Sequence, residues 1–312
     1  MKIINRFWFA TAAPALIGFA MVALCVRGFR LYGWSLFLGL PVAICFISAF
    51  CTSFRCQASF SRAYWISVLS LIFLGGMILS LGLDGLICLL MALPLALVLG
   101  LIGAFLGWKL GTSYNNGALA CLPMLLMLSF PWLVAFNNST STLPPIRSVT
   151  TTVSVDAPIE RVWRNVIAFP KITERPSGVF EFGIAYPIDA HIDGSGVGAI
   201  RHCNFSTGSF VEPITIWQEP THLAFSVSAS PPPMKEISFY DHLEAPHLHG
   251  HMISRHGEFR LTELNGQVLL QGTTWYTHSL SPQWYWGPIS DYLIHRIHQR
   301  VLNHIKRVAE SA

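Results

Sequence analysis

Long uncharged apolar stretches occupy the first 136 residues of the chain, and a mixed pattern of polar and apolar residues occupies the rest. About 20 helical residues, each rising 1.5 Å, cross the ~30 Å hydrocarbon core of a bilayer. Each apolar stretch is 19 to 24 residues long, which predicts an α-helical transmembrane bundle with five spans. The predicted spans are residues 7–26, 31–54, 63–83, 85–108 and 118–136.

Charged residues are sparse in the predicted membrane region. Residues 1–136 hold eight of the 36 charged residues, and none of the eight interrupts an apolar stretch. Transporters and channels place ionisable side chains inside the membrane, so this absence favours an anchor. Gly103, Gly107 and Gly111 recur every four residues, a spacing that indicates close helix packing.

The distribution of basic residues predicts the orientation of the helices. One side of the predicted bundle holds two basic residues, Arg27 and Arg30. The other side holds five: Lys2, Arg6, Arg55, Arg62 and Lys109. By the positive-inside rule, the N-terminus is cytoplasmic, and five spans place the C-terminal part outside the cytoplasm. The first stretch is too long for a cleaved signal peptide. We therefore expect an integral protein of the bacterial inner (cytoplasmic) membrane with an extracytoplasmic C-terminal domain.

A polar segment ending in two prolines separates the two parts of the chain. It predicts three regions: a transmembrane region at 1–136, a linker at 137–146 and a domain at 147–312. The linker is short, so the domain should stay near the membrane.

The C-terminal part carries 13 basic and 15 acidic residues, which gives no basic patch and excludes nucleic acid as an expected partner.

The C-terminal part alternates in the manner of an antiparallel sheet and closes with one long helix. Residues 149–155 are rich in β-branched side chains, and a short helix begins near Asp156 and Pro158. Asn265-Gly266 predicts a hairpin turn, and apolar steps of three and four predict a helix over 283–310. Further strands are predicted at 197–205, 210–217, 222–227, 248–253, 257–264 and 267–276.

Two segments of this part resemble a known superfamily. Residues 151–163 (TTVSVDAPIERVW) resemble the opening of the START-related SRPBCC superfamily, which includes polyketide cyclases/dehydrases and lipid-transport proteins. Residues 216–225 (IWQEPTHLAF) resemble its central strand pair. The resemblance covers about residues 147–310 and implies a helix-grip fold, in which a curved antiparallel sheet surrounds a long C-terminal helix. It also implies a hydrophobic ligand, but it carries over no catalytic residue.

Polar residues on the predicted strands and final helix are candidates for the wall of a ligand cavity. An arginine with a tyrosine could orient an acidic or carbonyl-bearing ligand, and a histidine could transfer protons. For each strand residue the alternative is an outward, solvated position, and for His304 it is a hydrogen-bonded core position. The candidates are Arg201, Glu212, His249, His251, Arg260, Tyr276, His298 and His304.

Histidines at 242, 247, 249, 251 and 256 form the densest cluster of potential metal ligands, and the three at 247, 249 and 251 alternate along the chain. On a strand they would share one face, but they would reach one metal only if the backbone bent. We therefore expect neither a metal nor another cofactor.

Three functional hypotheses remain: a membrane-anchored domain that binds a lipid or other hydrophobic small molecule, a cyclase/dehydratase-type enzyme, and a structural or sensory membrane protein. The sequence does not indicate an oligomeric state.

Overall fold

The computed structural model divides the chain into two compact units. The helical unit contains residues 1–143, 236–247 and 280–282, and the sheet unit contains residues 144–235, 248–279 and 283–312. The structure describes residues 2–29, 32–54, 56, 58–113, 134, 144–240, 243 and 245–311.

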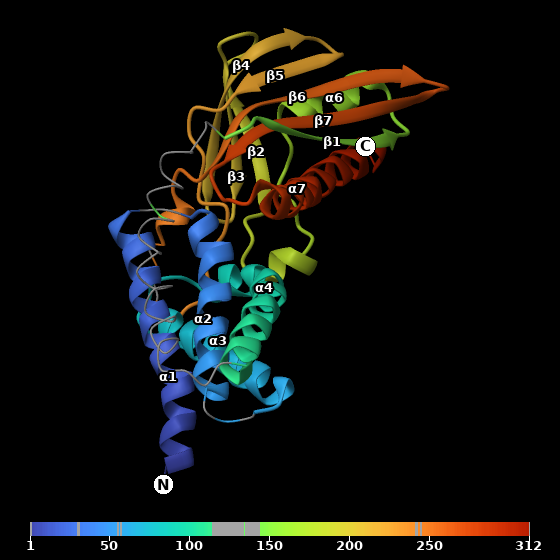
Figure 1. Cartoon of the computed structure of the whole chain (residues 1–312). Coiled ribbons are helices and arrows are strands. Elements are labelled where there is room, and N and C mark those ends of the chain that lie inside the picture. The colour runs from blue at the N-terminus through green and yellow to red at the C-terminus, as the bar shows by residue number, and fades with distance from the viewer. Residues whose placement is uncertain are drawn as a thin grey trace. The chain divides into compact units, whose positions relative to one another are not determined.

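Four helices of the helical unit are long and apolar enough to cross a membrane (Figure 1). The predicted fifth span at 118–136 lies outside the described residues except for Val134, as does the linker up to residue 143. The four candidate spans are Phe7–Gly28, Ser35–Ser53, Phe60–Ser80 and Leu86–Ser113. The helices are α1 (Lys2–Ala23), α2 (Leu40–Ser53), α3 (Phe60–Ser80) and α4 (Leu86–Ser113), with π-helical turns at Leu24–Gly28 and Ser35–Gly39.

Glycines of α4 allow it to approach α2 closely. A Cβ atom at Gly103 would lie 2.2 Å from the carbonyl oxygen of Val42, and one at Gly107 would lie 2.2 Å from that of Phe46. Both distances are far shorter than any real contact, and backbone atoms cannot rotate away. The close packing predicted from the glycine spacing is therefore confirmed.

Replacing Gly107 by alanine should lower the free energy of unfolding of the full chain by about 1–3 kcal/mol, because α2 and α4 must move apart. Gly76→Ala is a matched control, since a Cβ at Gly76 meets no atom within 4 Å. Unfolding in mixed micelles with rising SDS measures both variants. Equal stabilities would contradict this account of the helix contact.

A segment from much later in the sequence closes one end of the helical unit. Glu236 accepts hydrogen bonds from the backbone amides of Ile87 (3.0 Å) and Cys88 (3.3 Å) in the first turn of α4. A carboxylate at this place satisfies amides that have no partner within the helix and complements the positive end of its dipole. The Tyr240 hydroxyl donates to the carbonyl of Ser80, near the end of α3.

The sheet unit has the helix-grip arrangement. Its seven strands form one antiparallel sheet in the order β1-β7-β6-β5-β4-β3-β2, and the long helix α7 lies along the curled sheet (Figure 1). The strands are β1 (Arg147–Val155), β2 (Pro187–Asp193), β3 (Ile200–Phe205), β4 (Gly208–Gln218), β5 (His222–Ser226), β6 (Met252–Leu264) and β7 (Gln267–His278). The helices are α6 (Ile159–Ile167) and α7 (Gln283–Ser311), with a 3₁₀ turn at Gly178–Phe182. A second 3₁₀ turn, Pro246–Leu248, crosses the sequence boundary between the two units.

One apolar core joins the two helices of this unit to its sheet. The apolar stripe of α6, which includes Val162 and Trp163, is buried together with Leu302 and Ile305 of α7 and Leu270 of β7. The stripes follow the 3.6-residue period of a helix, so each helix buries one face and leaves the other to solvent. This core fixes α7 and thereby positions the side chains of its neighbouring turns.

Two strand predictions need correction. The predicted strand 248–253 is wrong over its first four residues, since Leu248 ends a 3₁₀ turn and β6 begins only at Met252. Residues 252–253 and the predicted strand 257–264 belong to the single strand β6, whose pairing with β7 is shifted between Ser254 and His256. Gly257 resembled a strand end but lies within β6, where a Cβ would come within 2.7 Å of the Phe225 ring. Strand β2 was not predicted, because charged and histidine residues alternate with its apolar residues.

Candidate functional site

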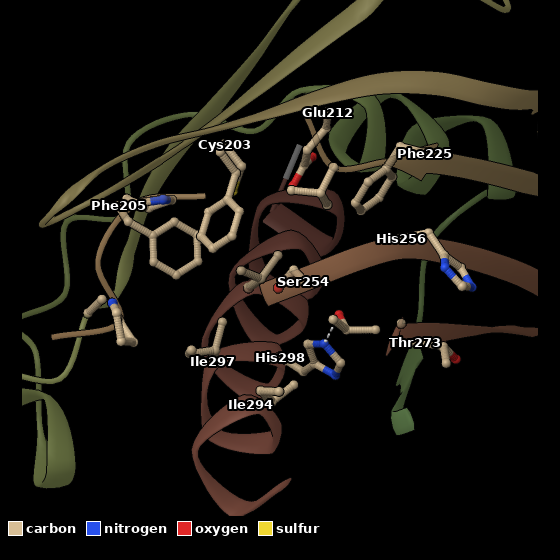
Figure 2. Close-up of a pocket in the computed structure, with 18 of the residues that line it drawn as sticks. Cys203, Phe205, Glu212, Phe225, Ser254, His256, Thr273, Ile294, Ile297 and His298 are labelled. Carbon is tan, nitrogen blue, oxygen red and sulfur yellow. Dashed lines mark hydrogen bonds between the residues drawn. The ribbon is translucent and has the colours of Figure 1, made fainter. Parts of the chain in front are cut away.

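A cavity of about 140 Å³ lies between the sheet and α7 (Figure 2). A cavity of about 150 Å³ in another protein is large enough to hold benzene, so this one can accept at least a small apolar group. Most of its wall is apolar. Prominent apolar lining residues are Phe205, Phe210, Phe225, Ile294, Ile297 and Val301.

The periods of the elements explain which side chains reach the cavity. Ile294, Ile297 and Val301 follow each other on α7 at steps of three and four, so they share one face, and His298 lies on the same face. On β3, Arg201, Cys203 and Phe205 alternate with outward residues. Figure 2 shows Ile297 and His298 of α7 and Phe205, Glu212 and Ser254 of the sheet around the same space.

Arg201 and Glu212 form a buried ion pair in the cavity wall. The two residues lie directly opposite each other on β3 and β4, and their side chains are 2% and 8% exposed. Arg201 Nε also donates to the carbonyl of Ile167 at 3.0 Å. Burial raises the pKa of the Glu212 carboxyl, although Arg201 opposes this effect. Each charge therefore depends on the other for its stability in this apolar environment.

Three phenyl rings surround the Arg201 guanidinium. Its Cζ atom lies 5.6 Å from the ring centre of Phe259 and 5.7 Å from those of Phe169 and Phe225. A guanidinium at this distance from a ring face is attracted to it. Nη2 of Arg201 is buried and has no hydrogen-bond partner among the described residues, so the rings are its principal surroundings.

His298 links α7 to the sheet through a neutral imidazole. Its Nε2 is hydrogen-bonded to Thr274 Oγ1 at 2.8 Å, and its Nδ1 to Thr151 Oγ1 at 3.2 Å. Burial is the main cause, and neighbouring His295 a smaller one, of a pKa of His298 lowered to about 4. The ring is therefore uncharged near pH 7, and both of its nitrogens are already engaged.

Few polar groups of the cavity remain available to a ligand. The hydroxyl of Ser254, on β6, makes no hydrogen bond within the described part of the chain. The thiol of Cys203 faces the cavity, but burial raises its pKa to about 12, so it is not the thiolate that nucleophilic chemistry requires. The wall thus offers the Ser254 hydroxyl and Nη2 of Arg201 as hydrogen-bonding groups within a largely apolar surface.

Of the eight candidates, Arg201, Glu212 and His298 line the cavity. Tyr276 and His304 are buried but lie away from it. The Tyr276 hydroxyl donates to Asp291 Oδ1 at 2.7 Å. His304 Nε2 is hydrogen-bonded to the carbonyl of Pro170 at 2.9 Å. This residue therefore occupies the hydrogen-bonded core position that was the alternative to a place in the cavity wall.

The other three candidates also lie away from the cavity. Arg260 is exposed and pairs with Glu258 on the same strand, with Nε 2.8 Å from Oε1. His249 is exposed, and His251 is hydrogen-bonded to Ser279 at 2.5 Å. Strand alternation gave two opposite faces, and the sequence did not show which face was concave. Ser254 was missed because serine gives no distinctive signal.

Comparisons with known proteins give structural likenesses at low sequence identity. No protein-family model matches the sequence, and no curated protein matches it. A structure from Nitrosospira multiformis is 18% identical, covers 53% of this chain and 97% of its own, and has a TM-score of 0.33. Truncated norcoclaurine synthase from Thalictrum flavum is 9% identical, with 54% and 96% covered and a TM-score of 0.35. The Aha1 dimer from Colwellia psychrerythraea is 11% identical, with 53% and 96% covered and a TM-score of 0.29.

Proposed function

We propose that the sheet unit binds a lipid or other hydrophobic small molecule and that the apolar helices anchor it in a membrane. The observation that carries this proposal is the largely apolar cavity between the sheet and α7. Concave apolar spaces with few polar groups are the usual sites of small-molecule binding. The four apolar helices support membrane anchoring by their length and composition.

The charges and hydrogen bonds of the wall favour an uncharged ligand. Arg201 and Glu212 already neutralise each other, so an added carboxylate or phosphate would be buried without a counter-charge. The nitrogens of His298 are engaged, which leaves the Ser254 hydroxyl and Nη2 of Arg201, a donor without a partner among the described residues, as hydrogen-bonding groups. An acyl ester, an alcohol or a ketone whose apolar group enters the cavity meets these requirements.

Filling the cavity should remove ligand binding. The full chain in lipid nanodiscs would be exposed to a photoactivatable acyl ester, and the labelled peptides would be mapped by mass spectrometry. We expect labels on cavity-lining segments of the sheet unit. Ile297→Trp should reduce this labelling at least tenfold, because the larger side chain occupies the space of the ligand.

Tyr292→Trp is the matched control, since Tyr292 lies on the same helix but is 53% exposed. It should label as the wild type does. Labels confined to residues 7–113, or equal labelling of the Ile297→Trp variant, would show that the probe occupies the bilayer and that the cavity takes no ligand.

A further inference from the structure

Two histidines and an aspartate gather on the face of β2 and β3 that points away from the cavity. Arg201 and Cys203 line the cavity, so His202 between them points to the opposite face. His191 is the direct cross-strand partner of His202. Asp193 lies two residues beyond His191 and therefore shares its face.

The donor atoms of these side chains already lie close together. The two imidazole rings are stacked, with centres 5.0 Å apart and planes inclined by 15°. Nε2 of His202 lies 3.5 Å from Oδ2 of Asp193, and one donor atom from each residue falls within 4.8 Å of the others. Two ligand atoms that each lie 2.0–2.2 Å from a tetrahedrally coordinated zinc ion are roughly 3.4 Å apart. The His202–Asp193 pair meets this separation without rearrangement.

The third ligand, His191, can reach the same metal position with a small movement of its side chain. His191 and Asp193 are exposed, so their side chains can rotate without disturbing the core. His202 is 26% exposed at its side chain and is the more fixed of the two histidines. The strand pairing holds the two backbones in register, so the ligands are brought together by the sheet and do not depend on a flexible loop.

We propose that His191, Asp193 and His202 bind a divalent transition-metal ion, with Zn²⁺ as the expected occupant. Two imidazoles and one carboxylate suit Zn²⁺ and leave a fourth position for water or another ligand. The site lies on the outer face of the sheet, so it is separate from the proposed cavity function. It also differs from the histidines at 247, 249 and 251 that the sequence indicated.

A second group of three donors in the described chain is explained without a metal. Asp84, Cys88 and Glu236 also lie within reach of one another. Both carboxylate oxygens of Glu236, however, accept hydrogen bonds from the first turn of α4. The histidine group has no comparable backbone role. Its two rings stack on each other, and the His202 ring lies beside the Asp193 carboxylate.

Titration with Co²⁺, which replaces Zn²⁺ and gives visible absorption bands, tests the site in the untagged full chain. We expect the wild type to bind one equivalent with a tetrahedral spectrum that Zn²⁺ abolishes. His191→Ala and His202→Ala should each weaken binding at least tenfold, and Asp193→Asn should weaken it less. Zn²⁺ should also raise the unfolding temperature of the wild type, because it binds the folded state.

His256→Ala is the matched control, since His256 is exposed and stacked on Trp275 on other strands. It should bind as the wild type does. The exposed His191→Ala variant should keep the metal-free unfolding temperature, which separates loss of a ligand from loss of the fold. An unchanged spectrum in His191→Ala, or wild-type Co²⁺ binding that only His256→Ala removes, would overturn the proposal.

Discussion

Replacing Glu212 by leucine should lower the free energy of unfolding of the sheet unit by about 3–5 kcal/mol. The variant leaves the Arg201 guanidinium buried in an apolar wall without its counter-charge. The three surrounding phenyl rings attract a cation, but this attraction is smaller than the desolvation cost of the charge. Urea unfolding of the full chain, followed by tryptophan fluorescence, measures the loss.

The double variant Arg201→Met/Glu212→Leu distinguishes a buried charge from a simple packing defect. It removes both charges and should recover most of the lost stability, because an apolar pair of similar volume needs no compensation. A double-mutant cycle then gives the coupling between the two residues. If the double variant is as unstable as Glu212→Leu, the ion pair does not account for the effect.

Acidification from pH 7.5 to pH 5 should destabilise the sheet unit through His298 by about 2 kcal/mol. The pKa of this imidazole is about 4 in the folded state against an ordinary value of 6.5. Between these values the unfolded chain binds a proton that the folded chain does not. The contribution is therefore complete above pH 6.5 and is lost as the pH falls towards 4.

The variant His298→Gln isolates this contribution from the other titrating groups. Glutamine can still hydrogen-bond to Thr151 and Thr274, but it carries no titrating proton. Its free energy of unfolding should depend less on pH in this window than that of the wild type. Equal pH dependence of the two proteins would exclude His298 as the source.

The sequence was most informative where one periodicity or one turn dominates. The helix predicted over 283–310 is confirmed as α7 (Gln283–Ser311), and the turn at Asn265-Gly266 is confirmed between β6 and β7. Both residues of that turn have positive φ angles, 51° and 80°, which asparagine and glycine tolerate. Strand β2 has no such signal, because its stability comes from pairing with β3.

The candidate site depends on strand register and on which face of the sheet is concave, and neither can be derived from the pattern of residues along the sequence. Arg201 and Glu212 could be proposed for the wall from their strand positions, but so could Arg260, which is exposed. The pairing shift at Ser254 and His256 changes which residues of β6 face inward. His191 and His202 are adjacent only through strand register, so the sequence did not distinguish them from the other histidines.

The contribution of Glu236 to the first turn of α4 bears on how this gene can change by recombination. The chain passes between the two compact units five times, at 143/144, 235/236, 247/248, 279/280 and 282/283. Residues 236–247 and 280–282 complete the helical unit although they are encoded within the C-terminal half. A gene fragment that begins at residue 144 therefore still encodes part of the helical unit. The two halves can be exchanged with those of other proteins only if these short segments are exchanged as well.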